Sequence, residues 1–266
     1  MAVVPRGVSD GFVVVRGFVG PTDLARLRAA FDLLLEIARR LDGPTEVDGS
    51  RFVVDREPFR IQRVTWCSGA APDLQAFGGD IRFLGLAGEC LGSNHVVQLI
   101  QQAHFKLPGD GVAFAWHQDA SNRRYGTDLW TDVDGFGSFV QIAVAVDPMG
   151  ARNGGLSFIP GSQRLGFRAD PITGELPENA FDRSTRVTPE LDAGDAVVFG
   201  PFVVHGSEPN DGAVSRRTFL QGYALPGANR RVYVGSGLGV ERPATSLGTG
   251  LFGPGETERD VRNRIR

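Results

Sequence analysis

The chain has 266 residues, of which 41% are hydrophobic and 22% are charged, and its formal net charge is −3. This is the profile of a globular protein long enough to bury a core, without the strong positive charge of a typical nucleic-acid-binding domain. Two cysteines are too few for a disulfide framework, and no apolar run reaches the length of a membrane span. The N-terminus has no secretory-signal pattern. We therefore expect a cytoplasmic protein that binds neither nucleic acid nor membranes.

The first 95 residues are predicted to combine short strands with helices. A β-branched run over 11–18 predicts a strand. After Pro21, leucine and phenylalanine recur at helical spacing as far as Leu41, so a helix is expected there, and Gly43 ends it. Further elements are predicted as strands near 51–54 and 60–65 and as helices over 72–77 and 80–91.

From residue 96 the chain changes to short β-type runs separated by glycine and proline turns. The predicted strands cover 96–107, 112–117, 138–147, 156–159, 196–199, 202–206 and 216–223. Such a series, with helices gathered towards the N-terminus, indicates a mainly β sandwich or barrel with flanking α-helices. We expect one domain over 1–266, with a helical support at about 20–95, a β core at about 96–225 and a loop-rich tail at about 235–266.

One strand predicts a cavity. Side chains of a strand alternate between its two faces. In 139–147 one face carries only bulky β-branched residues, which are typical of a packed core. The other face carries Phe139, Gln141, Ala143 and Ala145, which are poor residues for a solvent-exposed face. We therefore interpret this second face as the wall of a cavity, with Gln141 in its middle.

Three side chains form a candidate metal site. His117 and Asp119 are two positions apart at the end of a predicted strand, so both point the same way if the segment is extended. His205 lies in a second apolar run and is the best candidate for a third ligand. Two histidines and one carboxylate leave open positions on a metal ion and suit non-haem Fe(II) oxygenases. A hydrogen-bonded structural role is the usual alternative for a lone histidine, and we assign structural or pocket-lining roles to His95 and His104.

Arg216 is the candidate partner for an organic co-substrate. An open Fe(II) site commonly takes a bidentate organic acid together with O2, and a diacid needs a cation at its far end. Arg216 starts the last predicted strand, eleven residues after His205, and its guanidinium presents a rigid fork to a carboxylate. Arg217 must face the other side of the strand, and we interpret it as a surface charge.

These residues occur in an ordered set of motifs. Lys106-Leu107-Pro108-Gly109 precedes Trp116-His117-Gln118-Asp119, and a glycine-containing segment follows over 153–164. Gly194-Asp195, His205-Gly206-Ser207, Asn210 and Arg216 complete the set. Over about residues 96–230 the chain resembles the phytanoyl-CoA dioxygenase family, which are Fe(II)- and 2-oxoglutarate-dependent oxygenases.

The resemblance implies a double-stranded β-helix, a cupin-like jelly-roll of two sheets with helices outside. It also implies Fe(II) as the metal, with 2-oxoglutarate and O2 as co-substrates. The residues carried over are His117, Asp119 and His205 as catalytic Fe(II) ligands, and Arg216, Ser207 and Gln102 as the 2-oxoglutarate site. The segment 153–162 is implied to be structural.

The reaction implied by the resemblance is an oxidation coupled to decarboxylation of 2-oxoglutarate, and it most often hydroxylates an unactivated C–H bond. Asp119 favours hydroxylation, because related halogenases replace this carboxylate with a small residue so that halide can bind. The same iron chemistry used for desaturation, cyclisation or epimerisation is one alternative. A non-catalytic, cupin-like protein that binds a metal or ligand is another, and the oligomeric state is also open.

The substrate is predicted to be a small polar molecule or a natural product. The loop after the first metal strand, residues 121–130, is polar and aromatic. Its arginines offer partners for an anionic group and its aromatic side chains offer a cover, whereas a solvated loop with internal charge pairs explains the composition equally well. The candidate substrate residues are Gln141, Arg123, Arg124, Tyr125, Trp130 and His104.

Overall fold

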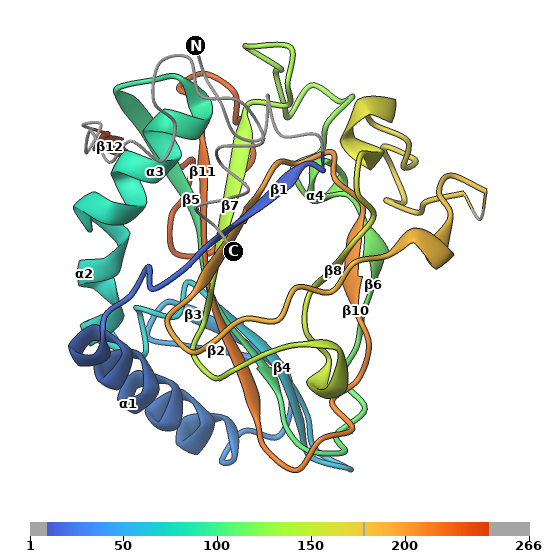
Figure 1. Ribbon diagram of the computed structural model, residues 1–266. Helices are drawn as coiled ribbons and strands as arrows, with labels where there is room; N and C mark the ends of the chain where they lie inside the picture. The colour runs from blue at the N-terminus through green and yellow to red at the C-terminus, as the bar shows by residue number, and fades with distance from the viewer. Residues whose placement is uncertain (1–9, 178, 245–266) are drawn as a thin grey trace.

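Two antiparallel sheets face each other, and helices cover the outer side of the larger sheet (Figure 1). The computed structural model describes residues 10–177 and 179–244. This layered arrangement is a jelly-roll, so the predicted mainly β fold with flanking helices is confirmed. Among the described residues, no helix is long and apolar enough to span a membrane.

Most strands are short, and the two longest, β5 and β11, pair in the middle of the larger sheet. The strands are β1 (Phe12–Val15), β2 (Thr45–Val47), β3 (Ser50–Asp55), β4 (Arg60–Thr65), β5 (His95–Lys106), β6 (Phe114–His117), β7 (Phe139–Ala145), β8 (Ser157–Phe158), β9 (Ala196–Phe199), β10 (His205–Ser207), β11 (Arg216–Ala224) and β12 (Val240–Pro243). The larger sheet has the order β1-β9-β7-β11-β5-β4-β3-β2, with β12 also paired to β5, and the smaller sheet has the order β6-β10-β8.

The longer helices precede the β core, as the sequence predicts. The helices are α1 (Pro21–Ala38), α2 (Gln75–Gly78), α3 (Ile81–Leu91) and α4 (Asp119–Asn122), and the 3₁₀ turns are η1 (Pro72–Leu74), η2 (Ala151–Asn153), η3 (Ser162–Leu165) and η4 (Arg183–Thr185). Pro21 takes the first position of α1, and the Asp80 side chain accepts from the backbone N–H of Arg82 to cap α3. The single helix predicted over 72–77 is instead a 3₁₀ turn followed by the short α2.

Strand β7 separates the main core from the inner side of the fold. Its bulky β-branched side chains are buried against α1 and α3, in a cluster that includes Phe31 and Phe83. On its other face, Ala143 and Ala145 pack in a second cluster, while Gln141 lines a cavity. The two-faced strand predicted from the alternation of large and small residues is therefore confirmed.

The predicted strand over 202–206 is wrong in its extent. Strand β10 begins only at His205. The backbone before it is used elsewhere, because the carbonyl oxygen of Pro201 accepts from the backbone N–H of Ala120 at 2.9 Å. The next two carbonyls are also bonded to side chains, since that of Phe202 accepts from Nε2 of Gln118 at 2.6 Å and that of Val203 lies 3.0 Å from Nδ1 of His205. Neither carbonyl is therefore used in a strand ladder.

Two expectations for the last part of the chain need correction. A loop was expected from about Gly235, but β12 pairs antiparallel with β5; the tail from residue 245 lies outside the described residues. Arg217 is not a free surface charge, because its Nε lies 2.8 Å from Oδ2 of Asp147 and its Nη1 lies 2.6 Å from Oδ1 of Asp32. This cluster ties β11 to α1.

Candidate active site

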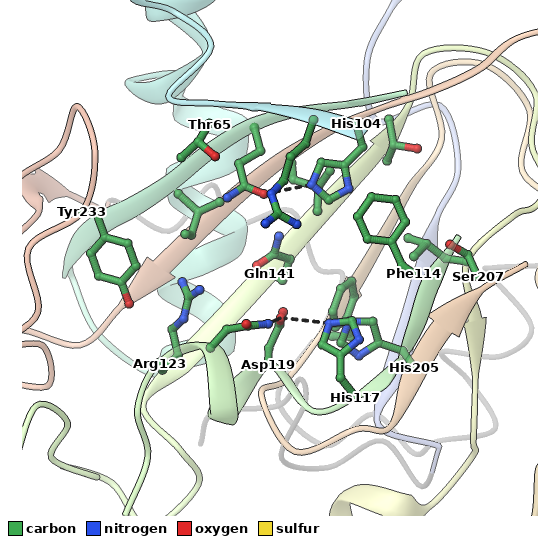
Figure 2. A pocket seen from close by; sticks show the side chains of 18 of the residues that line it. Thr65, His104, Phe114, His117, Asp119, Arg123, Gln141, His205, Ser207 and Tyr233 are labelled. Atoms are coloured by element: carbon green, nitrogen blue, oxygen red, sulfur yellow. Dashed lines mark hydrogen bonds and ion pairs between the residues drawn. The ribbon is translucent and has the colours of Figure 1, made fainter. Parts of the chain in front are cut away.

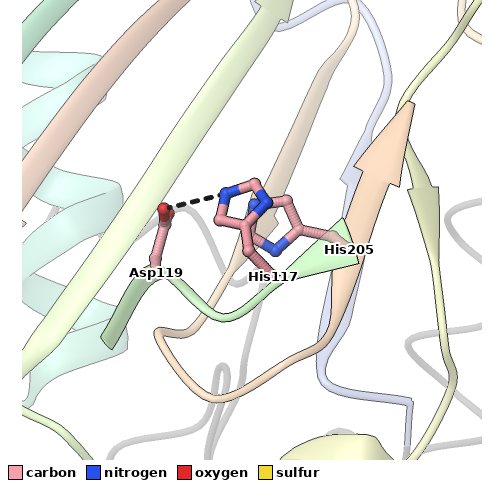
Figure 3. A group of neighbouring side chains, drawn as sticks. All are labelled: His117, Asp119 and His205. Carbon is pink, nitrogen blue, oxygen red and sulfur yellow. Dashed lines mark ion pairs between the residues drawn. The ribbon is translucent and has the colours of Figure 1, made fainter. Parts of the chain in front are cut away.

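Two strands of the smaller sheet bring the candidate metal ligands together. Strand β6 ends at His117 and pairs with β10, so His117 lies opposite His205 with the ring centroids 4.3 Å apart. Asp119 begins α4, and its Oδ1 lies 3.6 Å from Nε2 of His117. One ligand atom from each residue lies within 4.8 Å of the other two (Figure 3). The expected extended path holds only as far as Gln118, since Asp119 already starts a helical turn.

Backbone carbonyls set the orientation of both imidazole rings. Nδ1 of His117 lies 2.7 Å from the carbonyl oxygen of Ala115, and Nδ1 of His205 lies 3.0 Å from that of Val203. A carbonyl oxygen only accepts, so in each neutral ring Nδ1 carries the proton and Nε2 keeps its lone pair. Metal-binding histidines are commonly oriented by an outer hydrogen bond of this kind.

The protonation states also suit metal binding. Burial, together with the positive charge of His117, lowers the pKa of His205 to about 4, so this ring is neutral at pH 7. Burial alone would raise the pKa of the Asp119 carboxyl, but the contact with His117 and the charges of both imidazoles in their protonated forms outweigh it and hold the pKa well below its usual range. The same carboxylate raises the pKa of His117 against its burial, so this ring must give up its proton when a metal ion binds. Two imidazoles and one ionised carboxylate fit Fe(II).

Gln118 holds the ligand segment in place, a role that the sequence did not reveal. Its side chain is fully buried. Nε2 donates to the carbonyl oxygens of Gly166 at 2.9 Å and Phe202 at 2.6 Å, and Oε1 accepts from the backbone N–H of Arg168 at 2.8 Å. These bonds join the His117–Asp119 segment to the turn before β10, which carries the third ligand.

The three candidate ligands border a cavity of about 360 Å³, a size found in small-molecule sites (Figure 2). Every second residue of neighbouring strands faces it, which marks the inner face of the larger sheet. These residues are Arg63 and Thr65 on β4, Ile100, Gln102 and His104 on β5, Gln141 on β7, and Arg216, Thr218 and Leu220 on β11.

Arg216 offers a buried positive charge at this cavity. Only 1% of its surface is exposed. Its Nε donates to the carbonyl oxygen of Gly154 at 3.0 Å, and its Nη1 donates to Oγ1 of Thr218 at 2.8 Å. Burial lowers its pKa to about 10, so the guanidinium stays charged at neutral pH. Within the described ranges no carboxylate forms an ion pair with it, which leaves the charge for an incoming anion.

The two residues that orient Arg216 were not assigned to the site from the sequence. Thr218 follows two positions later on the same face of β11, and this spacing was a usable signal. Gly154 was expected to be only structural, but its carbonyl holds the guanidinium. It needs to be glycine because its φ is +69° and a Cβ would lie 2.4 Å from the carbonyl oxygen of Glu208.

Ser207 lies at the Arg216 end of the cavity. Its hydroxyl accepts from Nζ of Lys106 at 2.7 Å, and Lys106 is the residue opposite Arg216 in the β5–β11 pairing. Lys106 is fully buried and also donates to the carbonyl oxygen of Glu208. Burial and the charge of Arg216 lower the pKa of Lys106 to about 6.

Gln102, His104 and Gln141 all line the cavity. Nε2 of His104 lies 2.8 Å from Oε1 of Gln102, and its ring stacks on Phe114 with the centroids 4.7 Å apart. Burial and the charge of Arg63 hold the pKa of His104 well below its usual range, so the ring is neutral. His104 is therefore a lining residue fixed by its neighbours, and it lies apart from the group of candidate metal ligands.

The structure divides the substrate residues expected in the loop after β6. Arg123 lines the cavity, whereas Arg124, Tyr125 and Trp130 do not. The polar groups of these three residues donate hydrogen bonds outside the cavity. Nη1 of Arg124 donates to the carbonyl oxygen of Ile172 at 3.1 Å, and Oη of Tyr125 donates to Oδ2 of Asp132 at 3.1 Å. Nε1 of Trp130 donates to the carbonyl oxygen of Gly137 at 3.2 Å. The expected contact of these three residues with substrate therefore has no geometric basis.

The family model of phytanoyl-CoA dioxygenase (PhyH) matches residues 8–218. The chain belongs to the phytanoyl-CoA dioxygenase family. The family indicated by the sequence motifs is thereby confirmed.

Two relatives of the present chain are named as a dioxygenase and a hydroxylase. Dioxygenase ALT11 of Alternaria alternata is 26% identical over 214 residues, covering 78% of this chain and 66% of that protein. L-proline trans-4-hydroxylase of Streptomyces griseoviridis is 30% identical over 165 residues, covering 53% of this chain and 58% of that protein. The matched region thus spans less than two thirds of the length of either relative.

A solved structure shows the same fold. EvdO2 from Micromonospora carbonacea var. aurantiaca, crystallised with 2-oxoglutarate, has a TM-score of 0.64 and 22% sequence identity. The match covers 84% of this chain and 90% of that chain. It supports the jelly-roll described above.

Proposed function

We propose that this protein is an Fe(II)- and 2-oxoglutarate-dependent dioxygenase that hydroxylates an unactivated C–H bond of a small polar or natural-product substrate. The observation that carries the proposal is the convergence of His117, Asp119 and His205 within 4.8 Å at the wall of a cavity that also exposes the charge of Arg216. In the proposal, the first three residues hold Fe(II), and Arg216 holds the distal carboxylate of 2-oxoglutarate.

The residues of the candidate site each have a defined task in the proposed reaction. Iron and 2-oxoglutarate, when bound, supply the chemistry that activates O2 for attack on a C–H bond. Neutral His205 offers its Nε2 lone pair, and ionised Asp119 occupies the position that a halide would need, which favours hydroxylation. Arg216 fixes one end of the co-substrate through its fork of donors, while Thr218 and Gly154 keep that fork in place.

The proposed co-substrate end has further support from Ser207 and Gln102. The hydroxyl of Ser207 accepts a hydrogen bond from Lys106, which orients it. Lys106 is in turn the residue opposite Arg216 in the pairing of β5 and β11. Gln102 faces the same cavity from the neighbouring strand β5. Apolar Leu156 and Leu220 complete the wall and restrict water around the reacting groups.

The substrate class follows from size and from the relatives. A cavity of about 360 Å³ that must also take 2-oxoglutarate leaves room for a small molecule. One relative is named for hydroxylation of L-proline, a small polar amino acid. We therefore propose a substrate of comparable size. The cytoplasmic location and the lack of nucleic-acid partners stay predictions from the sequence.

The proposal is tested by titrating 2-oxoglutarate into Fe(II)-loaded protein without oxygen and recording the visible absorption. We expect a charge-transfer band that is lost in His205→Ala, and succinate on admission of O2. Protein that binds Fe(II) but shows neither the band nor succinate would contradict the assignment. Product analysis with an identified substrate then separates hydroxylation from desaturation, cyclisation or epimerisation.

A further inference from the structure

The cavity wall carries far more positive than negative charge. Among the described lining residues Asp119 is the one carboxylate, and there are five guanidinium groups: Arg51, Arg63, Arg123, Arg216 and Arg231. In the proposed function, Asp119 binds the metal and Arg216 binds 2-oxoglutarate. Among the described residues, none of the remaining arginines forms an ion pair with an acidic side chain, apart from the contact of Arg51 with Glu46 at 3.7 Å. This surplus predicts an anionic ligand in addition to 2-oxoglutarate.

Arg123 is the arginine whose surroundings are most specific. It is buried, with 7% of its surface exposed, and its Nε and Nη1 have no hydrogen-bond partner among the described residues. Its guanidinium carbon lies 4.9 Å from the ring centroid of Phe139 and 5.1 Å from that of Tyr233. Aromatic faces offset part of the cost of burying a cation, but they cannot replace its hydrogen bonds. Two buried donors therefore lack an acceptor.

Tyr233 supplies another polar group at the same place. Its hydroxyl is buried and also lacks a hydrogen-bond partner among the described residues. Figure 2 shows the Tyr233 hydroxyl turned towards the Arg123 guanidinium. The neighbouring Arg231 lies 5.1 Å from the same ring and is held by a 2.7 Å bond to the carbonyl oxygen of Asn122. A guanidinium and a phenol that converge in this way match the oxygens of an anion.

This group of side chains lies away from the end of the cavity assigned to 2-oxoglutarate. In Figure 2, Arg123 and Tyr233 are on one side of Asp119, whereas His205 and Ser207 are on the other. Ser207 marks the Arg216 end through Lys106. Arg123 is also fixed relative to Asp119, because its backbone N–H donates to the Asp119 carbonyl at 3.1 Å, one helical turn away. An anion at Arg123 therefore lies close to the proposed metal site.

We propose that Arg123 and Tyr233 bind an oxyanion of the substrate, a carboxylate or phosphate group, and hold the carbon to be oxidised within a few bonds of it. Arg231 adds positive charge beside this pair. The inference rests on the proposed function, which it deepens by naming the substrate as a small organic anion.

The test uses protein loaded with Zn(II), a diamagnetic substitute for iron, and 2-oxoglutarate. Retention of 2-oxoglutarate is measured first and tests the proposed function by itself. Binding of three probes is then compared by ligand-observed NMR: cyclopentanecarboxylate, cyclopentyl phosphate and the neutral cyclopentanecarboxamide. We expect at least one acid to bind at least about tenfold more tightly than the amide. The better of the two acids identifies the oxyanion.

Two variants and a matched control locate the binding. Arg123→Gln is expected to weaken the preferred acid at least about tenfold, and Tyr233→Phe about threefold, with 2-oxoglutarate binding unchanged. The neighbouring Arg124→Gln removes a positive charge outside the cavity and should have no effect. If 2-oxoglutarate binds but neither acid is preferred over the amide, or if both variants bind the acid as wild type does, the oxyanion site is wrong.

Discussion

The two ends of the cavity each present a buried arginine, but they are built differently. Arg216 belongs to β11 in the middle of the larger sheet, and its guanidinium already donates to Gly154 and Thr218. Arg123 follows a short helix, packs against aromatic rings, and keeps two buried donors without partners. The first end is preorganised by the scaffold and suits a co-substrate shared by a family. The second is carried by loops, which is where substrate specificity is commonly found.

The largest expected effect is a loss of Fe(II) affinity when one of the candidate metal ligands, which lie between the two ends of the cavity, is removed. His205→Ala removes one of the three candidate ligands, and among the described residues the group has no fourth member to replace it. We therefore expect Fe(II) affinity to fall at least about 100-fold, measured by anaerobic titration. His95→Ala is the control, because His95 is exposed and its Nδ1 lies 3.0 Å from Oδ1 of its neighbour Asn94. Equal losses in both variants would contradict the assigned site.

The Arg216 end is tested by Arg216→Lys. Lysine keeps the charge but loses the planar fork, so we expect 2-oxoglutarate to bind roughly 10- to 100-fold more weakly while Fe(II) binding is retained. Arg123→Gln should leave 2-oxoglutarate affinity within about twofold of wild type. The opposite order of effects would show that the two ends have been assigned the wrong way round.

Gly154→Ala tests whether the backbone at Gly154 orients the guanidinium of Arg216. An added Cβ meets the Glu208 carbonyl in a backbone with φ of +69°, so we expect a loss of about 2–4 kcal/mol in the free energy of unfolding and weaker 2-oxoglutarate binding. Gly109→Ala is the control, since its φ is +67° but nothing lies within 4 Å of its Cβ position. It should cost only about 1 kcal/mol in urea denaturation and should not change 2-oxoglutarate binding.

A further effect concerns pH and Lys106. Burial and the charge of Arg216 lower its pKa from 10.5 to about 6. Between these values the unfolded chain binds a proton that the folded protein does not, so this residue makes stability rise with pH over that window. Lys106→Met should flatten the slope of unfolding free energy against pH between about 6 and 10. Parallel profiles for the variant and wild type would show that the folded-state pKa is not lowered.

Local patterns explain why much of this site was predictable. The alternation in β7 identified the face that carries Gln141, and the His117–Asp119 spacing lies within one short segment. The third candidate, His205, was found because few histidines exist, although the strand that carries it was placed too early. Thr218 could also have been predicted from the sequence, since it lies two positions after Arg216 and so shares a strand face with it.

The Arg123 end was less predictable because it forms only when distant segments meet. Arg123 and Arg124 are equivalent in the sequence, and only the turn after α4 directs one inward and the other outward. Tyr233 lies in a segment with no strand pattern, where it forms an isolated bridge to Gly237, and its ring centroid lies 5.1 Å from the guanidinium carbon of Arg123. No local spacing carries that information.

The most direct test of the whole account is a crystal structure obtained without oxygen in the presence of Fe(II) and 2-oxoglutarate, with anomalous data at the iron edge. We predict one anomalous peak bound by His117, Asp119 and His205, and a 2-oxoglutarate whose distal carboxylate lies on Arg216, leaving Arg123 free for a second anion. An iron peak elsewhere, or a 2-oxoglutarate carboxylate on Arg123 in place of Arg216, would contradict the account.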